Sequence, residues 1–64
     1  QLLRRLVNQL SLKYISVVKL RYFKEMSYSE ISEELNLSES TVKIRLYRAR
    51  KELLKIFKLD DKIS

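Results

Sequence analysis

The sequence predicts a small all-α protein: one domain over residues 1–64, built of four helices and containing a helix-turn-helix. A length of 64 residues allows a single domain with a thin core. Apolar residues recur at spacings of three and four, the period of a helix with one buried face. An acidic helical segment is followed by a short turn and a basic helical segment, as in a helix-turn-helix. The expected helices cover approximately residues 2–9, 12–25, 28–35 and 39–57.

The first two helices are placed by apolar spacing, because the chain contains no glycine or proline to mark their ends. The first has apolar residues at positions 2, 3, 6, 7 and 10. Ser11 is of a residue type that caps helices, and the apolar residues of the segment 12–25 spread over more than one face. We therefore expect the second helix to pack between two partners.

The third helix and the turn after it are predicted from capping residues. Ser27 and Glu30 have the spacing of a capping box, in which each side chain bonds the other residue's free backbone N–H. Asn36 tolerates a left-handed backbone, so it can end the helix and redirect the chain. Ser38 can cap the fourth helix, with Glu39 in the first turn at the positive end of the helix dipole. Together these residues predict a tight turn between the third and fourth helices.

The fourth helix has an apolar side and a cationic side when it is placed on a helical wheel. Residues 27–40 contain acids and no base, whereas from Thr41 to Lys58 the basic residues stand against the single acid Glu52. With a net charge of +6, this arrangement places a positive field along one helix, which suits a polyanion. The side expected to face the core consists of Val42, Leu46, Ala49, Leu53 and Ile56, with Phe57 beside them.

Double-stranded DNA is the polyanion that the cationic side fits. In a major groove, arginine or lysine can donate to guanine, and an aliphatic or aromatic group can contact a thymine methyl. Residues at the flanks and ends of this side are better placed to contact phosphates and set the register. The base-reading candidates are Lys43, Ile44, Tyr47 and Arg48. The phosphate and positioning candidates are Ser40, Thr41, Arg45, Arg50 and Lys51.

Several of these candidates also have a purely structural interpretation. Ile44 or Tyr47 could pack against a neighbouring subunit. Ser40 and Thr41 could only help to cap the helix. Lys51, like Lys55, could pair with Glu52 or keep the domain soluble.

Composition argues against other classes of function. Without cysteine or histidine, the chain cannot build a Cys/His zinc site, a disulfide or a Cys/His nucleophile pair. Helical spacing turns Glu30 and Glu33 away from Glu34, so a structural role is expected for this acidic cluster. We expect no catalytic activity and no cofactor. The apolar runs are too short for a membrane span or a secretory signal, which favours a cytoplasmic protein.

Three runs carry a resemblance to a known family: Leu20-Arg21-Tyr22-Phe23, Ser27-Tyr28-Ser29-Glu30-Ile31 and Thr41-Val42-Lys43-Ile44-Arg45-Leu46-Tyr47-Arg48-Ala49-Arg50. Over residues 10–54 the chain resembles region four of bacterial RNA polymerase sigma factors, particularly the extracytoplasmic-function type, and the last run is similar to the recognition helix of that family. The chain departs from the family pattern at four positions. Ser11 stands where proline is common, Ile15 where arginine is common, and Asn36 and Ser40 where glycine is common.

The resemblance implies promoter recognition by an alternative sigma factor. The last helix would read the minus-thirty-five element in the major groove, and the family's base-proximal positions fall on residues 43, 44, 47 and 48. The domain would dock on the flap of the RNA polymerase beta subunit, and an anti-sigma factor is a further partner to consider. Because the apolar pattern starts midway, an upstream core-binding domain is expected. Apolar residues of the first two helices left over from the core are the flap candidates: Leu3, Leu6, Val7 and Ile15.

Two other functions stay open. A stand-alone transcription regulator with a sigma-like reader would dimerise to gain a second half-site. A sigma-like adaptor would bind other proteins and never read DNA. An enzyme fits least, because no nucleophile, base and oxyanion donors are arranged together.

Overall fold

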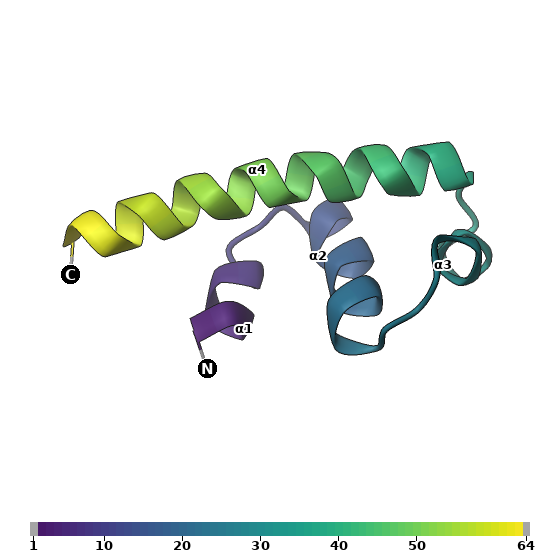
Figure 1. Cartoon of the computed structure of the whole chain (residues 1–64), viewed down its shortest axis with the longest axis horizontal. Coiled ribbons are helices and arrows are strands. Elements are labelled where there is room, and N and C mark those ends of the chain that lie inside the picture. The colour runs from purple at the N-terminus through teal and green to yellow at the C-terminus, as the bar shows by residue number, and fades with distance from the viewer. Residues whose placement is uncertain (1, 64) are drawn as a thin grey trace.

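The computed structural model describes residues 2–63, with the side chains of residue 2 and residues 4–58. α4 runs along one side of the molecule, and the shorter helices lie against its other side (Figure 1). The elements are α1 (Leu2–Val7), α2 (Leu12–Val18), the π-helix η1 (Lys19–Phe23), α3 (Tyr28–Leu35) and α4 (Glu39–Ile63). The predicted all-α domain with a helix-turn-helix is confirmed.

The core lies between α4 and the three α-helices that contact it, α1, α2 and α3. Burying an aliphatic side chain of valine or leucine size contributes roughly 1.5–3 kcal/mol, so a few such residues supply most of the stability of a small domain. The buried side chains that form one cluster are Val7, Leu10, Tyr14, Val17, Val18, Ile31, Val42, Leu46 and Ala49.

The predicted inner side of α4 is confirmed except at its C-terminal end. Val42, Leu46 and Ala49 are at most 1% exposed, and Leu53 and Ile56 are half-buried against the core. Phe57, which was expected beside them, is 45% exposed. α4 continues to Ile63 instead of ending near residue 57, and its C-terminal part extends past α1 (Figure 1). Phe57 is accordingly not among the side chains that pack against the core cluster.

The second predicted helix, over residues 12–25, is confirmed as helical from Leu12 to Phe23, but its C-terminal part is a π-helix. α2 ends at Val18, and the chain continues as η1, where the Lys24 N–H donates to the Lys19 carbonyl five residues earlier. The wider π turn changes the direction in which the following side chains point. η1 ends at Phe23, and Glu25 in the loop that follows has a left-handed backbone with φ of 54°.

The expected side-chain cap at Ser11 is also absent. Ser11 has the extended backbone of an N-cap residue, but its hydroxyl makes no capping hydrogen bond. Only its carbonyl takes part, accepting from the backbone N–H groups of Tyr14 and Ile15. Among the residues that the structure describes, no helix combines the length and the apolar character needed to cross a bilayer.

Candidate nucleic-acid interface

The turn between α3 and α4 fixes how α4 is presented. α3 begins with the predicted capping box: the Ser27 N–H donates to Glu30 Oε1 at 2.8 Å, and the Glu30 N–H donates to Ser27 Oγ at 3.1 Å. At the other end, Asn36 is left-handed (φ 55°, ψ 48°), and the Leu37 N–H donates to the Ser32 carbonyl at 2.9 Å. The bond from residue 37 to residue 32 is that of a Schellman motif. Asn36 therefore ends α3 as predicted.

Ser38 begins α4 by a side-chain cap. Its Oγ accepts from the Thr41 N–H at 3.1 Å and donates to Thr41 Oγ1 at 2.9 Å. Thr41 therefore takes part in the cap of α4 through both its backbone N–H and its hydroxyl. Glu39 lies in the first turn of α4, where its charge favours the helix N-terminus.

The four base-reading candidates share one exposed side of α4. Ile44 is 49% and Tyr47 is 56% exposed. Lys43, directly before Ile44, and Arg48, directly after Tyr47, are exposed as well. This side is turned away from the buried residues of the same helix. A helix side that only faces solvent does not require an aliphatic and an aromatic group among its cations. A major groove that presents thymine methyls does favour such groups.

The positioning candidates have more varied surroundings. Ser40, Arg50 and Lys51 are exposed, and Arg45 and Thr41 are half-buried. Lys51 Nζ lies 4.9 Å from the ring centroid of Tyr47, within the range of a cation–π contact. Lys51 therefore lies against Tyr47, a base-reading candidate one turn earlier in α4.

Three residues outside α4 join this surface and were missed by sequence reasoning. The guanidinium carbon of Arg21 lies 4.8 Å and Lys43 Nζ 5.7 Å from the ring centroid of Tyr28. Arg21 Nη1 also donates to the Met26 carbonyl at 2.9 Å, which holds the loop before α3. The third residue, Tyr22, joins the surface through its hydrogen bond with Arg50 of α4. No sequence spacing links these positions to α4, because they come together only through the packing of η1 and α3.

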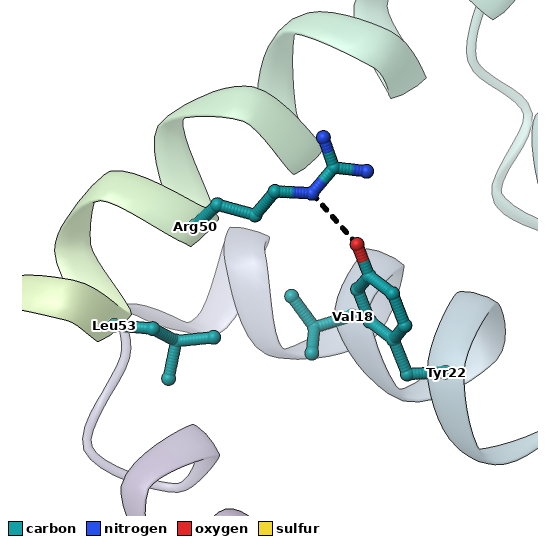
Figure 2. A pocket seen from close by; sticks show the side chains of 4 residues that line it. All are labelled: Val18, Tyr22, Arg50 and Leu53. Carbon is teal, nitrogen blue, oxygen red and sulfur yellow. Dashed lines mark hydrogen bonds between the residues drawn. The ribbon is translucent and has the colours of Figure 1, made fainter. Parts of the chain in front are cut away.

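Arg50 is held by a contact between distant parts of the chain. Its Nε donates to the Tyr22 hydroxyl oxygen at 2.7 Å, as Figure 2 shows. The hydrogen bond to Tyr22, with a smaller contribution from Tyr28, raises the pKa of the Arg50 guanidinium above its usual value. Arg50 is thus charged and oriented at the edge of the interface.

The flap candidates have to be revised. Leu6 is 5% exposed and Val7 is fully buried, so the expectation that they are left over from the core is wrong. Val7 belongs to the core cluster that includes buried residues of α4. Ile15 is half-buried, and the Leu3 side chain lies outside the described residues. Among the described side chains of α1 and α2, the apolar ones that remain exposed are Leu2 and Leu12, at 46% and 83%.

The fold and this surface define the class of protein, a helix-turn-helix domain with a basic second helix. A family model described as sigma-70, region 4, matches residues 1–53. ECF RNA polymerase sigma factor SigW of Bacillus subtilis (strain 168) is 46% identical to the chain over 43 residues, which are 67% of this chain and 23% of that protein. The chain thus spans less than a quarter of the length of that relative. No solved structure matches the chain significantly. The chain belongs to the sigma-70 region 4 family.

Proposed function

We propose that this domain recognises promoters as part of an alternative sigma factor, with α4 in the major groove of the minus-thirty-five element. Its membership of the sigma-70 region 4 family and the name of its relative, an RNA polymerase sigma factor, support this role. A domain of this kind targets polymerase to DNA in the cytoplasm and carries out no chemistry of its own.

The single observation that carries the proposal is the opposition of two sides of α4. Val42, Leu46 and Ala49 are buried, while the side that bears Lys43 and Tyr47 is exposed. A helix held from behind by its aliphatic side can enter a groove with its cationic side without disturbing the core. Direct readout in a major groove needs side chains of this kind within reach of base edges.

A docking surface for the polymerase flap forms the second part of the proposal. The exposed side chains of Leu2 and Leu12, together with half-buried Ile15, are the apolar groups of α1 and α2 that a flap segment can cover. Leu12→Asp should weaken binding to an isolated flap fragment and leave duplex binding unchanged. Loss of duplex binding together with flap binding would show that Leu12 has another role.

Selection of DNA by polymerase that carries the protein tests promoter reading. Random duplexes retained by the holoenzyme are sequenced, and a preferred upstream motif is expected. Lys43→Ala or Tyr47→Ala should change that motif at particular positions, because in the proposed orientation each side chain would reach the edges of particular base pairs. If the retained duplexes show no sequence preference while the domain still binds the flap, the adaptor function is favoured instead. Sedimentation as a dimer would favour a stand-alone regulator.

A further inference from the structure

Tyr22 and Arg50 connect η1 to α4 at the edge of the candidate interface. The bond runs from Arg50 Nε to the Tyr22 hydroxyl oxygen at 2.7 Å, between residues 28 positions apart in the chain. The guanidinium carbon lies 5.9 Å from the ring centroid, so the contact is made chiefly at the hydroxyl. Both side chains are exposed, which leaves this pair accessible to a ligand.

The Tyr22 ring lies beside a hollow that apolar side chains also line. Val18, 1% exposed, and Leu53, half-buried, line the same hollow as Tyr22 and Arg50 (Figure 2). A tyrosine side chain has only two rotatable bonds, so a hydrogen bond to its hydroxyl is made at low entropic cost. The π-helical turn that contains Tyr22 follows directly from buried Val18. The Tyr22 hydroxyl therefore reaches Arg50 from a helical segment that is anchored in the core at Val18.

The two terminal nitrogens of the exposed Arg50 side chain are accessible to a ligand. Tyr22 takes Nε, and the two terminal nitrogens point away from its phenol ring (Figure 2). Tyr28 is a second, weaker hydrogen-bonding neighbour of the same guanidinium. Those nitrogens form the fork that binds a phosphate through two parallel hydrogen bonds. An arginine that is already held loses less rotamer freedom when it binds than a free one does.

We infer that Tyr22 is a positioning residue for phosphate binding: it holds Arg50 through Nε so that the two terminal nitrogens bind one phosphate of the DNA backbone. The inference rests on the proposed function and adds a residue from outside the helix-turn-helix to the same site. The raised pKa of Arg50 agrees with the hydrogen bond. Because phosphates carry no sequence information, the effect of Tyr22 should be the same on any duplex.

A double-mutant cycle tests this inference on a duplex of random sequence. The dissociation constant of a fluorescein-labelled 30-base-pair duplex, at about 0.1 M salt, is measured for the parent chain, Tyr22→Phe, Arg50→Ala and the double variant. Tyr22→Phe keeps the ring and removes only the hydroxyl. It should weaken binding about threefold to tenfold in the parent and have no effect once Arg50 is absent. Tyr14→Phe, a hydroxyl removed in the core, is the matched control and should bind like the parent.

Arg50→Lys provides a second arm that does not depend on Tyr22→Phe. It keeps the charge and removes Nε, so it should lose affinity by at least as much as Tyr22→Phe does. An equal loss from Tyr22→Phe with and without Arg50, or parent-like binding by Tyr22→Phe and Arg50→Lys, would overturn the inference alone. Absence of salt-dependent duplex binding by the parent chain would overturn the proposed function, and this inference with it. Thermal unfolding followed by circular dichroism should place Tyr22→Phe within a few degrees of the parent, which separates a positioning role from a structural one.

Discussion

At the scale of single residues, the interface combines side chains that are held with side chains that are open to solvent. Lys43 lies against the ring of Tyr28, and Lys51 lies against the ring of Tyr47, each within cation–π distance. Such contacts restrict where a long cation points before DNA arrives. A lysine restricted in this way can help to set the register of the domain on a duplex. Arg48 is exposed on the same side and is best placed to test base reading.

Arg48→Ala should lower affinity for the selected promoter element by about 1–3 kcal/mol and relax sequence preference at one position. The reason is its place on the exposed side of α4, where a guanidinium can donate to guanine. Dissociation constants on selected and random duplexes give the measurement. Lys55→Ala, another cation on the same helix, is the control and should change little. Equal losses on both duplexes for Arg48→Ala would contradict direct readout.

Glu25→Gly should raise the free energy of unfolding by about 0.5–1 kcal/mol. Glu25 has φ of 54°, a backbone that costs a residue with a Cβ about 1–2 kcal/mol, and glycine removes that cost while adding chain entropy to the unfolded state. Urea unfolding measures the difference. Asn36→Gly, at φ of 55°, is the matched control and should change stability less, since asparagine already tolerates this backbone. Destabilisation by Glu25→Gly would show that the turn does not carry this strain.

At the scale of elements, the parts predicted correctly are those with local causes. The capping box, the left-handed Asn36 and the Ser38 cap each depend on residues within a few positions, so the bounds of α3 and the start of α4 follow from the sequence. The π-helix has no such local signal, because the same residues could continue an α-helix. Apolar spacing marks which side of α1 is buried but not whether a partner or the core covers it. Leu6 and Val7 were misassigned for that reason.

The capping box of α3 should make stability depend on pH through Glu30. Hydrogen bonds from the backbone and side chain of Ser27 lower the pKa of Glu30 below its usual value. A carboxyl with a lowered folded-state pKa stabilises the fold above its unfolded-state pKa of about 4.3, and this contribution is lost as the pH falls through the folded-state value.

Comparison of the parent chain with Glu30→Gln isolates that contribution. Glutamine can still accept from the Ser27 N–H, but it carries no charge to meet the helix dipole. Free energies of unfolding measured between pH 7 and pH 3 should favour the parent at neutral pH, and the difference should shrink on acidification. A difference that stays constant with pH would mean that the Glu30 charge has no part in the cap.

At the scale of the whole molecule, charge and shape act together. The domain measures 39 × 20 × 15 Å, with α4 along its length (Figure 1), and carries a net charge of +6. The sequence predicted which side of α4 is cationic, because helical periodicity is a local property. It did not predict that η1 and α3 extend this surface through Arg21, Tyr22 and Tyr28, because contacts across distant positions depend on the packed fold. The candidate interface is therefore wider than one helix.

A surface of this kind should bind duplex DNA with a strong dependence on salt. If about five phosphates are neutralised, released counterions make the logarithm of the binding constant fall with the logarithm of the salt concentration at a slope of roughly −4 to −5. Titrations of a labelled duplex between about 0.05 and 0.2 M salt measure the slope. Arg50→Ala removes one of the proposed phosphate contacts and should make the slope shallower by about 1, whereas Lys55→Ala, outside these contacts, should leave it unchanged. A flat response in the parent chain would mean that phosphates do not hold the domain on DNA, and the exposed cations of α4 would then need another partner.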